Sequence, residues 1–243
     1  MLDDCQVING DALEGLQTMS NESYDLVVTD PPYNIGIDYG EGRNADKKEN
    51  YIPWVKSWVN ELYRVLRPGG SMFLICGQEY AADIDKTITA AAFTIRNRIT
   101  WYETFGVYCH NKFGRTSRPI FYAVKGAGFT FNADAIRVKS ARQKLKDKRA
   151  NPLGKIPGDV WKFSRVCGNF KERQTGYPTQ LPSELVTRCV LVASNKNDKV
   201  LDPFSGSATV GVVSKQLGRV FCGIEKNEEY YKKSIERLAK VSG

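Results

Sequence analysis

The stretch that decides the fold reads DKVLDPFSGSATVGVVSKQLGRVFCGIEKNEEYYKKSIERL and spans residues 198–238. Its pattern is a short apolar strand, a loop of small residues, an amphipathic helix, and a second apolar strand that ends in an acid. In a nucleotide-binding βαβ unit, a loop glycine lets a ligand approach the backbone, and an acid about twenty residues further on binds ribose hydroxyls. Gly206 and Glu225 match these two positions, with Glu225 23 residues after Asp202. The stretch therefore predicts a nucleotide-binding half, although a glycine-bearing turn without a ligand would fit the same pattern.

The rest of the chain alternates between strand and helix patterns. Apolar runs predict strands at 5–8, 24–29, 71–76, 95–101 and 119–124, and 3.6-residue periodicity predicts helices at 53–66, 79–91 and 183–193. Leu66 lies on the apolar face of the first helix, and Pro68, Gly69 and Gly70 are expected to end it. We expect an α/β fold with a Rossmann-like, mostly parallel twisted sheet and helices on both faces.

Composition limits the class of protein. The 243 residues are 42% hydrophobic and 26% charged, which suits one sizeable core, and the apolar runs are too short for a membrane span. We expect a soluble, cytoplasmic protein. The six cysteines are scattered without CxxC pairs, so reduced thiols and no metal site are expected. His110 is the single histidine; we expect it in a loop and not as a catalytic base.

The excess of positive charge is confined to one segment. The chain carries a net charge of +8, and residues 127–173 hold twelve Lys or Arg against four acids, so the remainder is neutral. Such a segment is typical of contact with phosphate backbones, although a solvated charged face is the plainer alternative. The candidate DNA-binding residues are Arg137, Lys139, Arg142, Lys144, Lys146, Lys148 and Arg149.

A second motif, TDPPY at residues 29–33, follows the predicted strand 24–29. At the carboxyl end of a parallel strand, Asp30 can accept a hydrogen bond from an exocyclic amine. The Pro31 carbonyl, held rigid by the link to Pro32, can accept another, and Tyr33 offers a face for stacking a flipped base. Two acceptors on one amine would free its lone pair to attack a methyl donor. The plainer alternative is a proline-rich turn.

These motifs together resemble the amino-methyltransferases that modify DNA with S-adenosylmethionine. DPPY resembles their catalytic motif and LDPFSGS their cofactor loop, and the order of the two resembles the permuted β class. The resemblance implies a catalytic half at 1–125, a basic target-recognition segment at 126–176, and a cofactor-binding half at 177–243. It places Asp11 near the cofactor adenine and Thr179 and Gln180 near its methionine end. The other implied cofactor contacts are Asp202, Phe204, Ser205, Gly206, Ser207, Thr209 and Glu225.

Two positions depart from the family pattern. Tyr177 stands where a histidine is usual, and Ala208 where a glycine is usual. Because alanine disfavours left-handed backbone angles, Ala208 is expected to lie already in the helix that follows.

The resemblance implies site-specific methyl transfer to the N6 amine of adenine in double-stranded DNA, by base flipping and direct displacement. N4-cytosine methylation, RNA or protein-glutamine methylation and an inactive DNA-binding relative are the alternatives, and the absence of GxGxxG disfavours a nicotinamide enzyme. A homodimer and a cognate restriction endonuclease are further expected partners. The polar stretch 34–50 is expected to form either a lid over the base pocket or a passive loop.

Overall fold

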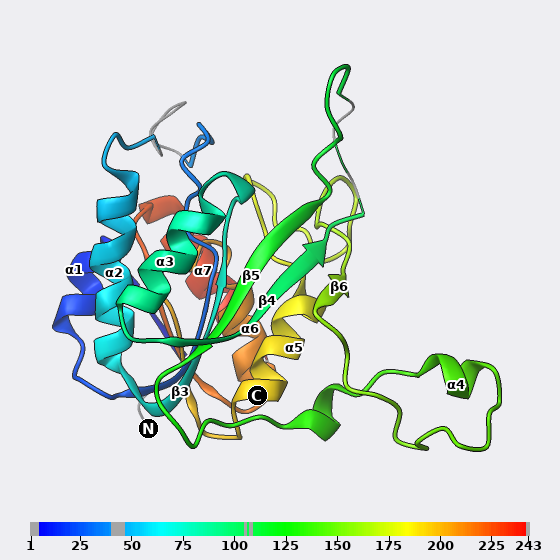
Figure 1. Ribbon diagram of the computed structural model, residues 1–243. Coiled ribbons are helices and arrows are strands. Elements are labelled where there is room, and N and C mark those ends of the chain that lie inside the picture. The colour runs from blue at the N-terminus through cyan, green and yellow to red at the C-terminus, as the bar shows by residue number, and fades with distance from the viewer. Residues whose placement is uncertain (1–4, 40–46, 105, 107–108, 242–243) are drawn as a thin grey trace.

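The computed structural model describes residues 5–39, 47–104, 106 and 109–241. Figure 1 shows one twisted sheet with helices packed on both of its faces. The strands are β1 Cys5–Asn9, β2 Tyr24–Thr29, β3 Leu66–Ile75, β4 Thr94–Tyr102, β5 Ser117–Val124, β6 Val160–Lys162, β7 Lys199–Asp202 and β8 Val220–Glu225. The helices are α1 Ala12–Thr18, α2 Tyr51–Val65, α3 Ala81–Ala90, α4 Ala141–Lys144, α5 Ser183–Ala193, α6 Thr209–Gln216 and α7 Glu228–Ala239, with 3-10 turns at Gln78–Tyr80 and Ala133–Ile136.

The sheet order is β1-β8-β7-β2-β3-β5-β4-β6. Every neighbouring pair is parallel except the two that involve β5. From β2 the chain continues outward to β3, whereas from β7 it continues in the other direction to β8. The boundary between β2 and β7 is therefore the topological switch point, where open α/β sheets bind ligands beyond the carboxyl ends of their strands. The predicted α/β fold with a mostly parallel sheet is confirmed.

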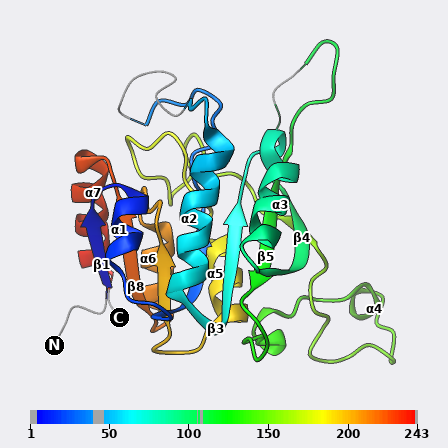
Figure 2. The ribbon, with the colours of Figure 1, turned by 60° about the vertical axis from the view of Figure 1, so that its left-hand side comes forward.

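Two apolar cores hold the layers together. Helices α1, α2 and α3 cover one face, where Leu16, Trp58 and Ile84 are buried against the sheet. Helices α5 and α6 cover the other face, together with Leu238 of α7. Figure 2 shows this separation, with α2 and α3 on the near side of the strands and α5 and α6 behind them. Both faces of the central strands are thus buried, which explains why β2 and β3 read as apolar runs.

The boundary between α2 and β3 differs from the prediction. The helix ends at Val65, and Leu66 is already extended, with φ −71° and ψ 135°. Leu66 pairs with Tyr24, and the register then jumps so that Ser71 pairs with Leu26. The Pro-Gly-Gly stretch at 68–70 therefore forms a bulge inside β3 and does not end the helix. Pairing with β2 makes the chain extended from Leu66 onward, before that stretch is reached.

Helix α1 and strand β6 are among the elements that have no counterpart in the predictions. Helix α1 begins at the N-cap Asp11, whose carboxylate accepts a hydrogen bond from the Leu13 N–H at 2.9 Å. Strand β6, inside the basic segment, pairs in parallel with β4 and buries Trp161 in the core. Part of the segment 126–176 thus belongs to the sheet. Across the described residues, no helix is both long and apolar enough to cross a membrane.

Packing of α6 on β8 gives a stability prediction at Gly211. A Cβ at this position would lie 2.6 Å from the Phe221 ring and 3.0 Å from Leu238. We expect Gly211→Ala to lower the free energy of unfolding by about 1–2 kcal/mol, because overpacking outweighs the gain in helix propensity. Urea denaturation measures this change.

The matched control is Gly15→Ala, also in a helix. Its Cβ would meet only the Ile224 side chain, at 2.8 Å from the flexible Cδ1 end. We expect a smaller loss or a gain there, and equal losses at the two glycines would contradict the packing argument.

Candidate functional site

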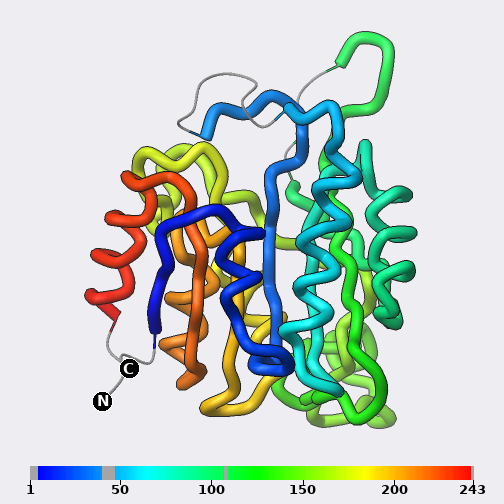
Figure 3. Tube along the Cα trace, turned by 90° about the vertical axis from the view of Figure 1, so that its left-hand side faces the viewer, coloured from blue at the N-terminus to red at the C-terminus, as the bar shows by residue number. Residues whose placement is uncertain are grey.

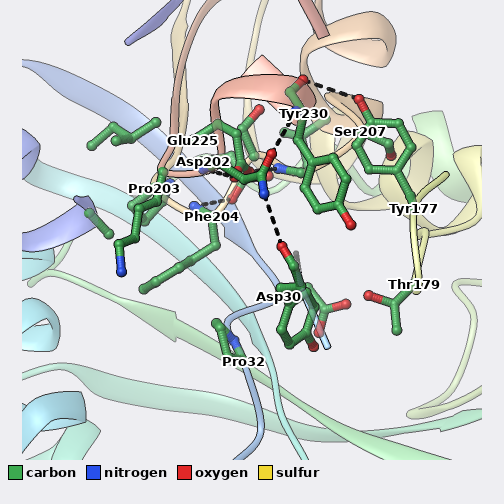
Figure 4. A pocket seen from close by; sticks show the side chains of 18 of the residues that line it. Asp30, Pro32, Tyr177, Thr179, Asp202, Pro203, Phe204, Ser207, Glu225 and Tyr230 are labelled. Carbon is green, nitrogen blue, oxygen red and sulfur yellow. Dashed lines mark hydrogen bonds between the residues drawn. The ribbon is translucent and has the colours of Figure 1, made fainter. Parts of the chain in front are cut away.

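The loops that follow β1, β2, β7 and β8 enclose a cavity beyond the carboxyl ends of these strands. Figure 3 shows the loop after β2 and the start of α7 at this same end of the molecule. Figure 4 shows Asp30 and Pro32 on one side of the cavity, Asp202 and Glu225 on another, and Tyr177 and Thr179 on a third. This first cavity is lined by Gly10–Ala12, Asp30, Pro32, Tyr39, Lys48, Trp54, Tyr177–Leu181, Asp202–Ser207, Thr209, Val210, Ile224–Asn227 and Tyr230.

Asp202 ties β7 to β2. Its Oδ1 accepts a hydrogen bond from the Thr29 hydroxyl at 3.0 Å and another from the Phe204 N–H at 3.1 Å. Burial raises the pKa of Asp202 to about 7, and these two hydrogen bonds act in the opposite direction. A buried carboxylate at the switch point is costly, so its presence marks a candidate functional site.

Glu225 organises the loop after β7. Its Oε2 accepts from the Gly206 N–H and its Oε1 from the Asn227 N–H, both at 2.8 Å. Burial raises its pKa, and the backbone donors oppose that shift. Gly206 has φ +48°, and a Cβ there would meet only the Phe204 carbonyl, at 4.0 Å. The loop therefore leaves open space in front of its backbone.

The expectation for Ala208 is wrong. The residue does not take helical angles; it caps α6 in the left-handed region, with φ 56° and ψ 33°. This conformation costs an alanine about 1 kcal/mol. Its side chain is fully buried, its N–H donates to the Ser205 carbonyl at 2.8 Å, and its carbonyl accepts from the Val212 N–H at 2.9 Å. Core packing and these hydrogen bonds hold the strained turn in the shape that glycine adopts freely.

Phe204, Ser205, Ser207 and Thr209, also predicted as cofactor residues, all line the first cavity. Phe204 packs edge-on against Trp54 and Trp58 at ring distances of 5.7 and 5.3 Å, which fixes the cavity floor. Ser207 and Thr209 are buried and both accept hydrogen bonds from Arg237 of α7, the first through its carbonyl.

The segment 177–181 closes the cavity from a third side. The Tyr177 hydroxyl donates to the Tyr230 carbonyl at 3.1 Å, so the residue in the histidine position is a buried packing residue. Thr179 lines the cavity. The Gln180 amide is occupied with the backbone of the same segment, donating to the Glu172 carbonyl and accepting from the Gln174 N–H, each at 2.8 Å. Gln180 therefore helps to hold the shape of this segment, and it also lines the first cavity, where contact with the ligand was expected.

Asp30 lies where two cavities meet. A second cavity is lined by Asp30, Trp101, Arg118, Arg165–Cys167, Arg173, Gln174 and Tyr177–Leu181. Asp30 is the acidic residue that lines both cavities. Burial raises its pKa to about 6, with the Arg118 cation and the Tyr33 hydroxyl acting in the opposite direction.

The rest of the TDPPY motif is placed differently from the expectation. Pro31 is buried and lines neither cavity, whereas Pro32 lines the first and its carbonyl accepts from the Tyr51 hydroxyl at 2.8 Å. Tyr33 is 6% exposed and also lines neither cavity. Its hydroxyl donates to the Asp30 carboxylate.

The seven candidate DNA-binding residues lie away from both cavities. They belong to a basic lobe, residues 137–158, which the Val138–Lys155 bridge closes at its base. Figures 1 and 2 agree that the lobe, marked by α4, projects from the body away from the cavity end. Arg137 is bound to Asp134 and to the Gly154 carbonyl, and Arg149 to Asp147. Of the seven candidates, five are exposed and form no ion pair with described residues: Lys139, Arg142, Lys144, Lys146 and Lys148.

The predicted lid at 34–50 falls partly outside the described residues, which omit 40–46. Its described ends are anchored: the Asn34 side chain donates to the Tyr80 hydroxyl at 2.9 Å, and the Tyr39 carbonyl accepts from Asn227 at 3.2 Å. Tyr39 and Lys48 line the first cavity. His110 lies between β4 and β5, in a loop, as expected.

Several site residues escaped sequence reasoning. Tyr39, Trp54 and Tyr230 line the first cavity, and Arg118 lines the second. Trp54 falls within the helix predicted at 53–66, and nothing in that pattern indicates that it lines a cavity. Arg237 resembles an ordinary exposed cation in an amphipathic helix, and nothing in its local sequence indicates that it reaches Ser207.

A chain with this sheet, this switch point and these two motifs is a DNA methyltransferase by family. The family described as DNA methylase matches residues 24–236, and the chain belongs to it. The DNA adenine methyltransferase YhdJ of Escherichia coli (strain K12) is 41% identical over 242 residues, covering 96% of this chain and 82% of that protein. The Type II methyltransferase M.HpaI of Haemophilus parainfluenzae is 37% identical over 237 residues, covering 97% and 74%.

Solved structures share the fold. The cytosine-N4-specific PvuII DNA methyltransferase superposes with a TM-score of 0.74 at 19% identity, covering 97% of this chain and 86% of that one. TTHA0409 from Thermus thermophilus, a putative DNA modification methylase solved with S-adenosyl-L-methionine, gives a TM-score of 0.66 at 25% identity, covering 96% and 94%.

The buried acid Asp202 gives a pH prediction. Its pKa rises from 3.8 to about 7 on folding, so the folded protein holds a proton that the unfolded chain releases, and stability falls as pH rises through this window. Between pH 5 and 8 the loss due to Asp202 is on the order of 2 kcal/mol. We expect Asp202→Asn to weaken the pH dependence of the free energy of unfolding by about that amount, measured by urea denaturation at both pH values.

The control for this experiment is Asp83→Asn, at an exposed acid on α3. It should leave the pH dependence unchanged. An Asp202→Asn protein with the wild-type dependence would show that Asp202 does not carry a buried proton.

Proposed function

We propose that this protein transfers a methyl group from S-adenosylmethionine to the N6 amine of adenine at a specific sequence in double-stranded DNA. The observation that carries the proposal is the position of Asp30 between an acid-rich cavity at the switch point and an arginine-rich cavity beside it. One cavity suits the methyl donor and the other suits the acceptor base. The family membership supports the same reaction.

The chemistry of the first cavity fits S-adenosylmethionine. Its lining contains four acids, Asp11, Asp30, Asp202 and Glu225, against two lysines, Lys48 and Lys226. An acid-rich, partly buried site favours a ligand that carries positive charge. Bound there, S-adenosylmethionine supplies a methyl group on a sulfonium cation.

Individual residues of this lining have distinct proposed roles. Asp11 and Glu225 would accept hydrogen bonds from the nucleoside part of the ligand, since each carboxylate oxygen has a second lone pair. The aromatic floor formed by Phe204 and Trp54 would pack against its flat base. Gly206 leaves room for the ligand to approach the loop. Ser205, Ser207, Thr209 and Thr179 would line the remaining wall.

The second cavity would receive the target base. A base inside a duplex cannot reach a carboxylate that lines a cavity of the protein, so the base must rotate out of the helix. Asp30 would then accept a hydrogen bond from the exocyclic amine through Oδ2, the oxygen that the Tyr33 hydroxyl leaves free. The carboxylate orients the amine, so that its lone pair faces the first cavity, and stabilises the positive charge that develops on nitrogen. The amine nitrogen would form a bond to the methyl carbon as the bond from that carbon to sulfur breaks, so that sulfur leaves as a neutral thioether. The surplus proton on nitrogen would pass to the Asp30 carboxylate or to water.

Adenine is the proposed target base because the 41% identical E. coli relative is named an adenine methyltransferase. The competing target is the N4 amine of cytosine, since the same carboxylate would hold either amine, and the PvuII enzyme with this fold is cytosine-N4-specific. Identification of the modified nucleoside decides between them.

We also propose that the segment 126–176, including the basic lobe, contributes phosphate contacts and target recognition between the catalytic half at 1–125 and the cofactor half at 177–243. The support is its concentration of exposed lysines that form no ion pair with described residues. A second copy of the chain and a restriction endonuclease of the same specificity are further proposed partners. The second of these is supported by relatives named Type II methyltransferases.

Replacement of Asp30 tests the reaction. We expect Asp30→Ala to lower the rate of methyl transfer by about 100-fold or more, because the amine loses its acceptor, while affinity for S-adenosylmethionine changes little. The rate is measured with S-adenosylmethionine labelled in the methyl group and double-stranded DNA of mixed sequence, followed by chromatography of the nucleosides. Calorimetry measures the affinity, and Asp83→Ala is the control.

Two results would count against the proposal. Wild-type protein that labels no nucleoside would exclude the reaction. Asp30→Ala protein with the wild-type rate would exclude the mechanism.

Neutralising the basic lobe tests its role. We expect serine at Lys139, Lys144, Lys146 and Lys148 together to weaken DNA binding at least tenfold at about 0.1 M salt. Each lost phosphate contact should reduce the slope of log K against log[salt] by about 0.9. The matched control replaces four exposed lysines on the body, Lys56, Lys86, Lys196 and Lys240, with the same change in charge. Equal slopes in the two variants would exclude phosphate contacts by the lobe.

A further inference from the structure

Four side chains contact one another in series: Asp30, Tyr33, Arg118 and Glu103. The last two form a buried ion pair. The Tyr33 hydroxyl donates to Asp30 Oδ1, and Arg118 Nη1 donates to the same hydroxyl oxygen at 3.1 Å. Arg118 Nε in turn pairs with Glu103 Oε1 at 3.0 Å. Asp30 follows β2, Glu103 follows β4, and Arg118 is the second residue of β5. Because β5 runs opposite to its neighbours, its start lies at the edge where β2 and β4 end.

Packing confines the Arg118 guanidinium. It lies 5.2 Å from the centroid of the Tyr33 ring and 5.4 Å from that of the Trp101 ring. Trp101 is itself held by a hydrogen bond from its indole N–H to the Phe163 carbonyl at 2.8 Å. The Arg118 and Glu103 side chains are 18% and 6% exposed, so both charges lie largely out of water. An arginine enclosed in this way has few alternative rotamers, and its planar fork keeps a fixed direction.

The Glu103 carboxylate directs its charge to Arg118. Its second oxygen, Oε2, is buried and accepts no hydrogen bond from the described residues. A buried charge is tolerated only when it is paired, so the two side chains depend on each other. Burial of this ion pair carries a desolvation cost. An uncharged side chain would fill the space between the two aromatic rings without that cost.

Tyr33 is the link between this pair and the carboxylate. Burial raises the pKa of its hydroxyl, so the group stays protonated and donates to Asp30. With Oδ1 bound to Tyr33, the carboxylate cannot rotate freely, and Tyr33 leaves its Oδ2 available to another donor. We propose that Arg118, held by Glu103, is a positioning residue that fixes the Tyr33 hydroxyl on one oxygen of Asp30 and so directs the other oxygen to the target amine. This inference rests on the proposed function.

The arrangement gives the Tyr33 hydroxyl a role that is separate from the stacking expected of its ring. In this structure the ring is buried, with the Arg118 guanidinium 5.2 Å from its centroid. A stacking role depends on the ring alone. A positioning role depends on the hydroxyl, which Tyr33→Phe removes while the ring and the ion pair stay.

Arg118 also affects the charge of Asp30. Its cation favours the ionised carboxylate, which is the form that accepts from an amine; loss of the cation therefore raises the pKa of Asp30. Glu103 acts in the opposite direction. The titratable and charged groups that face Asp30 are Tyr33 from its own loop, Arg118 from β5, Glu103 after β4, Asp202 from β7, Cys76 after β3 and Tyr51 from α2.

The test compares Tyr33→Phe, Arg118→Met and Arg118→Lys with wild type. We expect Tyr33→Phe and Arg118→Met to lower kcat by about 10–100-fold, while the affinity for S-adenosylmethionine measured by calorimetry stays within about twofold. The acidic limb of the kcat/KM profile should move to higher pH by about one unit in Arg118→Met. Arg118→Lys retains the charge and should restore most of the pH shift but not all of kcat.

Arg98→Met is the matched control. Arg98 pairs with Asp85 at an exposed position on β4, and its loss removes an ion pair without touching the site. It should leave kcat and the pH profile unchanged. Thermal unfolding of each variant identifies any that fails to fold, and Tyr33→Phe, which keeps both charges and the ring, then carries the test.

The readouts separate this inference from the proposed function. Carbon-13 NMR titration of the Asp30 carboxyl, assigned with Asp30→Asn, should show a higher pKa in Arg118→Met and Tyr33→Phe whether or not the protein methylates DNA. An active wild type together with variants of unchanged kcat and unchanged Asp30 titration overturns the positioning role. An inactive wild type with the expected titration shifts counts against the proposed reaction and leaves the link between Arg118 and Asp30 supported.

Discussion

The rest of the site depends on the pairing of β2 with β7. Leu26 pairs with Val200 and Val27 with Leu201, and the buried hydrogen bond from Thr29 to Asp202 joins residues 173 positions apart. This contact brings the ends of two strands together at the point where the direction of chain progression reverses. The loops after both strands, the capped start of α1 and the anchored start of α7 then surround one space. Without this pairing, the two motifs would be surface turns at unrelated places.

The same contact concentrates negative charge in a poorly solvated place. Asp30, Asp202 and Glu225 all have raised pKa values, and burial is the main cause in each. The protein offsets this with backbone N–H groups aimed at Asp202 and Glu225, and with the guanidinium beside Asp30. Three acids whose pKa values are raised by burial do not favour the stability of the protein without a ligand. The arrangement is suited to a ligand that brings positive charge and to a carboxylate that must accept a hydrogen bond, as the proposed reaction requires.

Sequence patterns predicted the fold class and most elements, because buried strands and amphipathic helices repeat locally along the chain. They failed where a distant segment overrides a local preference. Pairing with β2 turned the expected helix end at Leu66 into a strand, and core packing holds Ala208 in a left-handed turn that alanine disfavours. For the site, the motifs located Asp30, Asp202, Gly206 and Glu225, since each is adjacent to a strand end that the sequence marks.

The sequence by itself determined the fold class, most of the strands and helices, the two motif loops, and the family to which the chain belongs, because these are properties of contiguous residues. Only the tertiary structure decided that the Tyr33 hydroxyl lies on Asp30, that Arg118 and Glu103 stand behind it, and that the basic lobe projects away from the cavities. Those facts depend on side chains from separate strands meeting at one edge of the sheet. A contact between residues 85 positions apart, such as that of Arg118 with Tyr33, leaves no periodic pattern in a single sequence.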